Sequence, residues 1–316
     1  MKILVTGGAG YIGSVLVPTL LNEGHEVTVL DNFLFRQNSL FECCANPNFK
    51  IVNGDVRNLE LVEKLVQDKD YIFPLACLTG FPLSKKDPVA ATTVTRDAVL
   101  SMLKMLKPEQ KIIYPNTNSG YGVGDGNNFC TEESPLRPVS LYGKLKVETE
   151  VAIRERGNFV VFRLATVFGA SPRMRMDLLV NDFVYRAYKD RAIVLFESHF
   201  KRNYVHVRDV VGAFMFAMSH WETLQKQWGG GNTIFNLGLD EANYTKMELC
   251  QEIKKQIPEL NIFEAQIGQD PDKRDYIVSN EKLSKAGYTA KITVAEGITE
   301  LLKAYQIVHT GEYFNV

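Results

Sequence analysis

The sequence predicts an α/β fold in which a doubly wound parallel sheet is followed by a smaller α/β domain. Short apolar runs alternate with stretches of helical period through the first half of the chain, and a glycine-rich turn joins the first run to the first helical stretch. Uniformly apolar strands suit a sheet buried on both faces, and their alternation with helices favours parallel βαβ units.

Apolar runs give the expected strands of the sheet, which lie at 2–5, 26–30, 49–52, 71–73, 111–114 and 159–162. Helical stretches separate them, at 15–22, 59–66, 89–106 and 142–156. In the more mixed second half we expect helices at 177–188, 207–220, 246–256 and 294–305, and strands at 193–196, 233–236 and 261–264. A shift in composition near residue 168 predicts one domain of residues 1–168, to which 200–222 return, and a second of residues 169–316.

The composition restricts the possible partners. The 316 residues are 45% apolar, and 36 basic against 37 acidic side chains leave a net charge of −1. This balance excludes a disordered chain and offers no basic surface to nucleic acid or an anionic membrane. No apolar run approaches the roughly 18 residues of a transmembrane helix, and the N-terminus does not resemble a signal peptide. Five cysteines without a C-x-x-C pair and scattered histidines predict no disulfide framework and no bound metal, so we expect a cytoplasmic protein.

The glycine-rich turn is the strongest local signal. Thr6-Gly7-Gly8-Ala9-Gly10-Tyr11-Ile12-Gly13 follows the first expected strand and opens the first helix. Its glycines allow a tight turn, a close approach of the backbone to a pyrophosphate, and close packing of helix on strand. Unpaired amides at the start of the helix attract the same pyrophosphate. The unit predicts a Rossmann-type dinucleotide-binding domain.

Two acidic residues are placed to contact the adenosine part of a dinucleotide. Asp31 ends the second strand, where a carboxylate accepts from ribose hydroxyls and repels a 2′-phosphate, which favours NAD over NADP. Asp55 follows the third strand, where it could face the adenine amino group or cap the helix at 59–66.

Tyr142 and Lys146 stand four apart at the start of an expected helix, so both lie on one face. A nearby ammonium and an oxidised nicotinamide favour the phenolate, so the pKa of Tyr142 is expected to fall and Tyr142 could remove a proton from a hydroxyl. Tyr185 and Lys189 share this spacing, and a plain surface pair is the alternative reading for either. Tyr142 is preferred because it follows the fifth strand and its long loop, on the binding edge. Thr117, in that loop, could hold the reacting hydroxyl or only stabilise its own turn.

Together these motifs resemble those of the extended short-chain dehydrogenase/reductase family, the nucleotide-sugar epimerases and dehydratases. The resemblance includes Asp31-Asn32, Gly54-Asp55-Val56, Pro74-Leu75-Ala76 and segments 163–169 and 202–210, and covers most of the chain. It implies bound NAD, a nucleoside-diphosphate sugar in the cleft and oxidation at sugar C4. By the same resemblance Tyr142 is the base, Lys146 lowers its pKa and orients the nicotinamide ribose, and Thr117 contacts the C4 oxygen.

The resemblance also implies which residues hold each ligand, and a homodimer formed through helices 89–106 and 142–156. The expected cofactor-binding residues are Gly7, Gly10, Tyr11, Ile12, Gly13, Asp31, Asn32, Asp55, Val56, Leu75, Ala76, Tyr142 and Lys146. The expected substrate-binding residues are Thr117, Asn118, Ser119, Arg173, Asn181, Arg202 and Arg274. Of these, Asn181, Arg202 and Arg274 fall where the family binds the nucleotide diphosphate, and an arginine fork suits phosphate oxygens.

Several positions depart from the family pattern. Dehydratases carry Asp-Glu directly after the catalytic Thr, whereas Asn118 and Ser119 stand here. Neither is a general acid at neutral pH, which disfavours 4,6-dehydration. Thr95 replaces the usual Asn of the helix after the fourth strand. Cys77 stands where a small residue is usual and is expected to be a buried structural thiol.

Parts of the chain look more like the GDP-heptose 4-dehydrogenases of bacterial capsule pathways. The shared runs are 116–122, 130–138, 171–183 and 270–276, and the third includes Arg173 and Arg175, which could line the substrate site or lie in solvent. We therefore expect a 4-dehydrogenase of a GDP-linked heptose or hexose. A redox-neutral 4-epimerase of a nucleotide sugar would use the same residues. A non-catalytic NAD-binding regulator is a third hypothesis, against which the intact Thr117, Tyr142 and Lys146 argue.

Overall fold

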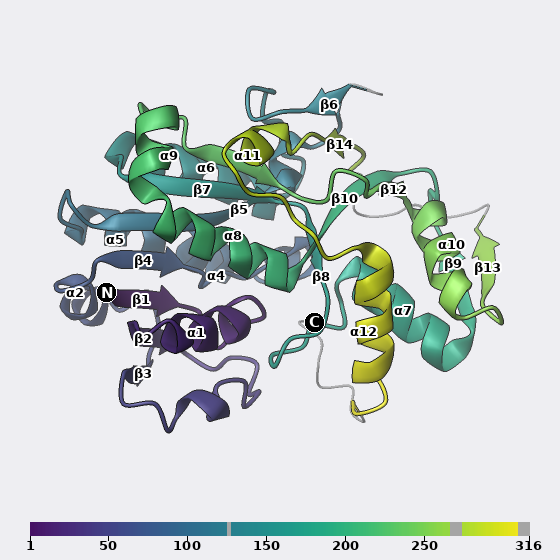
Figure 1. Ribbon diagram of the computed structural model, residues 1–316, viewed down its shortest axis with the longest axis horizontal. Coiled ribbons are helices and arrows are strands. Elements are labelled where there is room, and N and C mark those ends of the chain that lie inside the picture. The colour runs from purple at the N-terminus through teal and green to yellow at the C-terminus, as the bar shows by residue number, and fades with distance from the viewer. Residues whose placement is uncertain (125–127, 266–273, 309–316) are drawn as a thin grey trace.

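A parallel sheet of seven strands forms the centre of the molecule, with helices on both faces (Figure 1). The computed structural model describes residues 1–124, 128–265 and 274–308. Neighbouring strands follow the order β11-β7-β5-β4-β1-β2-β3 and are all parallel, so the chain starts inside the sheet and winds outward in both directions. This confirms the predicted doubly wound α/β fold. The strands are β1 (Lys2–Thr6), β2 (Glu26–Asp31), β3 (Phe49–Asn53), β4 (Tyr71–Pro74), β5 (Lys111–Thr117), β7 (Phe159–Leu164) and β11 (Ile234–Leu237).

Alternate side chains of the strands enter separate hydrophobic layers. The helices around this sheet are α1 (Gly13–Asn22), α2 (Leu59–Val66), α3 (Phe81–Lys86), α4 (Pro88–Thr92), α5 (Ala98–Met105), α6 (Leu141–Arg156), α8 (Val207–Ser219) and α9 (Trp221–Trp228). Ile3 and Val5 of β1 belong to the layer with α1 and α8, whereas Leu4 belongs to the layer with α2 and α5. All three are fully buried, which explains the uniformly apolar strands of the sequence.

The helix expected at 89–106 is widened in its middle. Residues Thr93–Asp97 form a π-helical segment between α4 and α5. The Thr93 hydroxyl donates to the carbonyl of Val89 at 2.9 Å, one turn back, and so competes with the regular backbone ladder. A π-segment is common beside functional sites, and Val94 of this one lines the cleft described below.

The fifth strand is longer than expected and ends at Thr117 rather than Tyr114. Proline is unusual inside a sheet because it cannot donate to the ladder. Pro115 is tolerated because β4 pairs with β5 only at Lys111 and Ile112, so β4 has ended before Pro115 is reached. The extension carries Thr117 to the carboxyl edge of the sheet.

The second half of the chain adds small sheets and helices beside the large sheet. A three-stranded sheet consists of β8 (Thr166–Phe168), β10 (Lys201–His206) and β12 (Asn243–Thr245), and two pairs consist of β9 (Ala192–Leu195) with β13 (Asn261–Glu264) and β6 (Phe129–Cys130) with β14 (Ile277–Val278). The helices are α7 (Leu179–Asp190), α10 (Lys246–Gln256), α11 (Glu281–Lys285) and α12 (Val294–Ala304). The apolar pattern does not predict β10, because its first three residues, 201–203, are polar.

Two segments of the second half lie against the first half. β11 pairs with β7 at the edge of the large sheet. α8 places Phe214 against Phe73 and Phe162, with ring centroids 5.7 Å apart in both pairs. The two halves therefore share one hydrophobic core.

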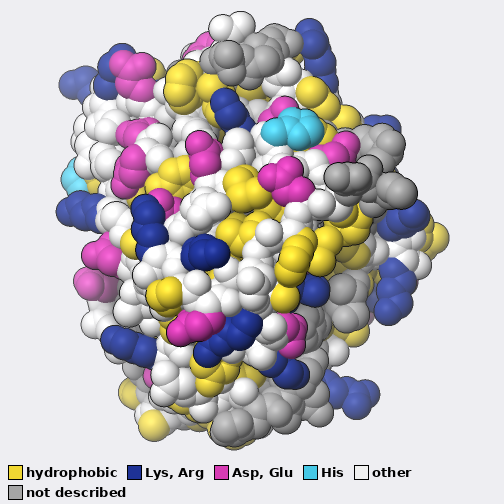
Figure 2. All heavy atoms as spheres, turned by 90° about the vertical axis from the view of Figure 1, so that its right-hand side faces the viewer, with side chains coloured by type: hydrophobic (Ala, Val, Ile, Leu, Met, Phe, Trp, Pro, Cys, Tyr) yellow, Lys and Arg dark blue, Asp and Glu magenta, His cyan; other side chains and the backbone are white. Residues whose placement is uncertain are grey.

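Charges of both signs are mixed on the surface. Figure 2 shows the face that carries α7, α10, β9 and β13, where basic and acidic side chains are interspersed around apolar ones. Within the described ranges, no helix is both long and apolar enough to cross a bilayer.

Candidate active site

A deep cleft follows the edge at which the parallel strands end. It is lined by the loops after β1, β2, β3, β4 and β5, by the start of α6 and by the segment after β8. Every residue expected to bind a dinucleotide lines this cleft. Four of the expected substrate residues line it too, namely Thr117, Ser119, Arg173 and Arg274.

The glycine-rich loop forms a cradle that a side chain would fill. Gly7 has a φ of +69°, and a Cβ there would lie 2.5 Å from the backbone nitrogen of Ala76. A Cβ on Gly13 would lie 2.5 Å from the carbonyl oxygen of Gly8. These positions therefore need glycine because the loop packs directly against the backbone after β4 and against its own backbone. A pyrophosphate in this cradle would face the start of α1.

The acidic residues of the cleft lie beside the loops after β2 and β3, where the sequence predicts the adenosine of NAD, and we call this part of the cleft the adenosine end. Asp31 accepts from the backbone nitrogens of Ala9 at 3.0 Å and Phe33 at 2.8 Å, and burial raises the pKa of its carboxyl. Ion pairing with Arg57, at 2.6 Å, lowers the pKa of Asp55 to about 2. The cap of α2 is Asn58, so the capping role considered for Asp55 is wrong.

Tyr142 and Lys146 occupy the first two turns of α6, with Ser140 as the N-cap. Lys146 is buried, donates to the carbonyl of Pro115 and lies 3.9 Å from the ring centroid of Tyr114. Burial lowers the pKa of Lys146 to about 8. The alternative pair, Tyr185 and Lys189, lies outside the described lining of the cleft, with Lys189 Nζ 3.4 Å from the Tyr185 hydroxyl.

The pKa of Tyr142 does not fall as expected. Burial raises it, and so does the neighbouring Cys77. The pKa of Tyr142 is lowered, in turn, by the charges of Arg175 and Arg274 and by the neighbouring Thr117 hydroxyl. The Lys146 ammonium donates to the carbonyl of Pro115 instead.

Two hydrogen bonds link Thr117 to Arg274 through Ser119, in the cleft that Tyr142 also lines. The Thr117 hydroxyl donates to Ser119 Oγ at 2.9 Å, and the Ser119 hydroxyl accepts from Arg274 Nη1. The only carboxylates among the described cleft-lining residues are Asp31 and Asp55, at the other end. Among the residues that the structure describes, the site near Tyr142 therefore offers a phenol, hydroxyls and guanidinium groups, but no carboxylate.

Arg173 was expected at the substrate but lies at the adenosine end. Its guanidinium carbon is 4.0 Å from the ring centroid of Phe35, and its charge acts on Asp31. Its backbone nitrogen donates to the hydroxyl of Ser14 at 3.2 Å. Arg175, which sequence reasoning left open between cleft and solvent, lines the cleft and pairs with Asp177 at 2.6 Å.

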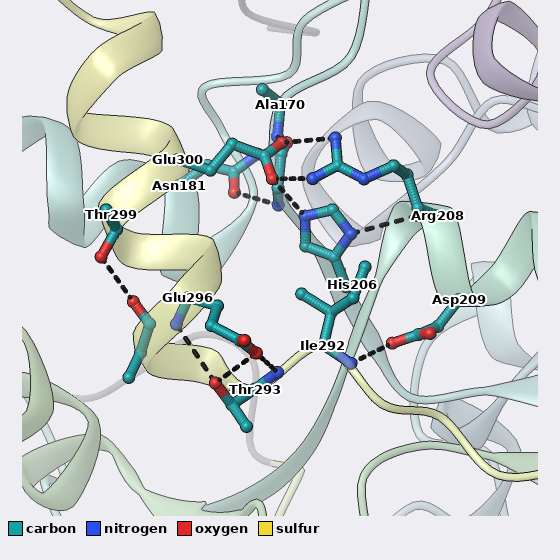
Figure 3. Close-up of polar contacts among 12 residues, drawn as sticks. Ala170, Asn181, His206, Arg208, Asp209, Ile292, Thr293, Glu296, Thr299 and Glu300 are labelled. Atoms are coloured by element: carbon teal, nitrogen blue, oxygen red, sulfur yellow. Dashed lines mark hydrogen bonds and ion pairs between the residues drawn. The ribbon is translucent and has the colours of Figure 1, made fainter.

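Residues 169–175, which carry these arginines, are fixed by contacts from both halves of the chain. From the first half, the Tyr11 hydroxyl donates to the carbonyl of Gly169 at 2.6 Å. From the second half, Glu300 of α12 accepts from the backbone nitrogen of Ala170 at 2.9 Å, and Figure 3 shows this carboxylate between His206 and Arg208. His206 Nε2 is 3.1 Å from Glu300, while its Nδ1 accepts from the backbone of Arg208. The position of the segment thus depends on both halves of the chain.

Three expected substrate residues lie outside the described lining of the cleft. Asn181 is buried, and its amide holds the backbone of Gly169 at 3.1 Å and Arg175 at 2.8 Å. Arg202 is buried, and its guanidinium carbon lies 5.8 Å from the ring centroid of Tyr276. Asn118 is buried in the turn after Thr117. Residues 270–273 of the fourth shared run fall outside the described residues.

Two features of the site had no clear signal in the sequence. Cys77, expected to be a buried structural thiol, is half-buried and lines the cleft, with its sulfur 3.4 Å from the hydroxyl of Thr95. Glu150 and Arg163 form a buried ion pair beneath the loop that carries Thr117. Only the topology brings these residues to the site, because they come from four separate elements.

Comparison with known proteins agrees with this geometry. The sequence pattern of the NAD dependent epimerase/dehydratase family matches residues 3–238. The chain is 28% identical to UDP-glucuronic acid decarboxylase 1 of Arabidopsis thaliana, over 97% of this chain and 70% of that protein. It is 26% identical to UDP-glucose 4-epimerase of Lactobacillus helveticus, over 81% of each. The crystal structure of UDP-glucose 4-epimerase from Thermotoga maritima with UDP-glucose is 25% identical and has a TM-score of 0.80, over 97% of this chain and 99% of that one.

Proposed function

The chain belongs to the NAD-dependent epimerase/dehydratase family, and from this premise we propose that it oxidises the C4 hydroxyl of a nucleoside-diphosphate sugar. The observation that carries the proposal is that Thr117, Tyr142 and Lys146 line one cleft whose described carboxylates lie only at the adenosine end. A phenol and hydroxyls can deprotonate and orient an alcohol. Elimination of water would need an acid–base pair that these side chains do not provide.

The side chains have separate tasks in this proposal. Thr117 holds the C4 hydroxyl, and Tyr142 removes its proton. Arg175 and Arg274 favour the phenolate that this step requires, because each lowers the pKa of Tyr142. Bound NAD supplies the hydride acceptor. Lys146 orients the nicotinamide ribose, and a positive charge on Lys146 or on the ring would lower the pKa of Tyr142 further.

The glycine cradle and Asp31 support the assignment of the cofactor residues. Gly7, Gly10 and Gly13 would face the pyrophosphate, and Asp31 the adenosine ribose. Arg173 is reassigned here from substrate to cofactor, because it contacts Phe35 and acts on Asp31. Ser119 and Arg274 remain as contacts of the sugar nucleotide. Asn181 acts indirectly, by holding the backbone of Arg175.

We propose a GDP-linked heptose or hexose as the substrate and a 4-keto sugar as the product, because the runs around 116–138 and 171–183 resemble GDP-heptose 4-dehydrogenases. The alternative is a redox-neutral 4-epimerase, favoured by the relatives named UDP-glucose 4-epimerase. The resemblance to the extended family supports a homodimer formed through α4, α5 and α6, and the cysteine pattern and N-terminus support a cytoplasmic location. Val89 and Val151 on these helices are 72% and 47% exposed, which suits such a contact.

A panel of GDP-, UDP- and dTDP-sugars tests the proposal. The purified protein is incubated with each sugar and NAD, while NADH absorbance, a trapped 4-ketone and the sugar composition are measured. Stoichiometric NADH and a ketone from a GDP-sugar are expected. Conversion to a C4 epimer without NADH or ketone would refute the dehydrogenase and leave the epimerase. No reaction at C4 with any sugar would refute both.

A further inference from the structure

A buried ion pair lies beneath the catalytic loop. Glu150 comes from α6 and Arg163 from β7, and their side chains are only 2% and 3% exposed. The pair is bidentate: Arg163 Nη2 donates to Glu150 Oε1 at 2.7 Å, and Nε donates to Oε2 at 3.1 Å. Burying two charges costs free energy, and apolar residues in their place often stabilise a fold at least equally. Stability alone therefore does not explain this pair, and its contacts with other residues indicate what else it does.

The ion pair contacts both ends of the loop that carries Thr117. At one end, the Asn116 amide donates to Glu150 Oε2 while its carbonyl accepts from the backbone of Thr117 at 2.8 Å. At the other end, Arg163 Nη1 donates to the Tyr121 hydroxyl at 3.0 Å. Thr117 and Ser119 lie between these two hydrogen bonds, Asn116–Glu150 and Tyr121–Arg163, which we call the tethers.

The helix of Glu150 also carries the proposed base. Tyr142, Lys146 and Glu150 are spaced by four residues, so they lie along one side of α6. Each lies beside a different residue at the end of β5. Lys146 donates to the carbonyl of Pro115, Glu150 accepts from Asn116, and Tyr142 lies close enough to Thr117 for that hydroxyl to lower the pKa of Tyr142.

We propose that the Glu150–Arg163 ion pair is a positioning device that sets the Thr117 hydroxyl against Tyr142. The inference rests on the proposed function of those two residues. Glu150, Arg163, Asn116 and Tyr121 are positioning residues, because they act on the reacting groups only through the loop. Loosening either tether would let Thr117 move away from Tyr142, and the phenolate would lose the neighbouring hydroxyl that lowers the pKa of Tyr142.

Single-tether variants test this without exposing the buried charges. Tyr121→Phe removes the bond to Arg163, and Asn116→Ala removes the bond to Glu150. Tyr288→Phe is the matched control, since the Tyr288 hydroxyl donates to the carbonyl of Asp209 at 2.6 Å, away from the cleft. We expect kcat to fall about 10- to 100-fold in both tether variants, with KM for the sugar nucleotide within about threefold. The control should keep its kcat even if its melting temperature falls similarly.

The pKa of Tyr142 provides a readout that needs no sugar. With NAD bound, ultraviolet absorbance is titrated for each protein and for the same protein carrying Tyr142→Phe, and the difference isolates Tyr142. Both tether variants should raise this pKa by about half a unit or more, and the control should not. Unchanged Tyr142 titration in both tether variants would overturn the inference, whether or not the sugar panel reveals C4 oxidation. Failure of the panel alone would refute only the proposed function.

Discussion

Replacing Lys146 by methionine should change how the stability of the cofactor-free protein depends on pH. Lys146 is fully enclosed between Tyr114 and the carbonyl of Pro115, and its pKa is lowered from 10.5 to about 8. A lysine that binds its proton more weakly in the folded state favours unfolding when it is protonated. The penalty is therefore complete below about pH 8 and is relieved as the pH rises towards 10.5.

The size of the penalty follows from the two pKa values. A shift of the pKa from 10.5 to about 8 lowers the free energy of unfolding by about 3 kcal/mol at pH 7 and by about 1 kcal/mol at pH 10. Methionine cannot be protonated, so residue 146 no longer makes the free energy of unfolding depend on pH in the variant. It also leaves the carbonyl of Pro115 without its donor, at a cost of about 1–3 kcal/mol that does not vary with pH. The pH dependence, rather than the absolute stability, therefore isolates the effect of the buried charge.

The assay is urea unfolding, followed by circular dichroism, of cofactor-free wild type and Lys146→Met between pH 7 and pH 10. The difference in unfolding free energy, variant minus wild type, should fall by about 2–3 kcal/mol over this range. Lys144→Met on the exposed side of the same helix is the control and should show no such trend. Parallel pH profiles for Lys146→Met and wild type would show that the ammonium is not destabilised by burial, and would refute the reasoning.

Three further predictions concern the cleft. Tyr142→Phe should lower kcat about 10²- to 10⁴-fold with the Kd for NAD nearly unchanged, because only the base is lost; an equal loss in Tyr185→Phe would contradict the assignment. Gly7→Ala should weaken NAD binding at least about tenfold and lower the melting temperature, since its Cβ would meet the backbone of Ala76 at 2.5 Å. Gly24→Ala is the control, because Gly24 also has a positive φ but open space around it. It should lower the free energy of unfolding by only about 1 kcal/mol and leave NAD binding intact. Iodoacetamide should label Cys77 more slowly when NAD is bound, while the exposed Cys44 reacts equally in both states; equal labelling of Cys77 by mass spectrometry would place the cofactor elsewhere.

The elements predicted most accurately are those whose signal is local. The helices at 59–66 and 246–256 and the strand at 261–264 have the expected bounds, because apolar period and flanking residues suffice to define them. The glycine-rich loop and the strand end at Asp31 also carry their chemistry in consecutive residues. The sequence alone therefore predicted which residues line this end of the cleft.

Elements that depend on distant partners were missed or altered. β8 and β10 are strands because they pair with each other across about 40 residues, although β10 begins with Lys201 and Arg202. The extension of β5 through Pro115 depends on where β4 ends. Hydroxyl back-bonding from Thr93 accompanies the π-segment that interrupts the expected helix.

The sequence by itself determined the fold class, through the alternation of apolar runs with helical stretches. It also predicted the glycine-rich loop and the Tyr142–Lys146 pair from spacing within one segment, and Thr117 from its place after an expected strand. Only the tertiary structure decided the electrostatics around them. It moved Arg173 to the adenosine end, placed Arg175 and Arg274 near Tyr142, and set the Glu150–Arg163 pair beneath the loop. Burial and the charges of distant segments fix a pKa and a side-chain position, and neither follows from the order of residues along the chain.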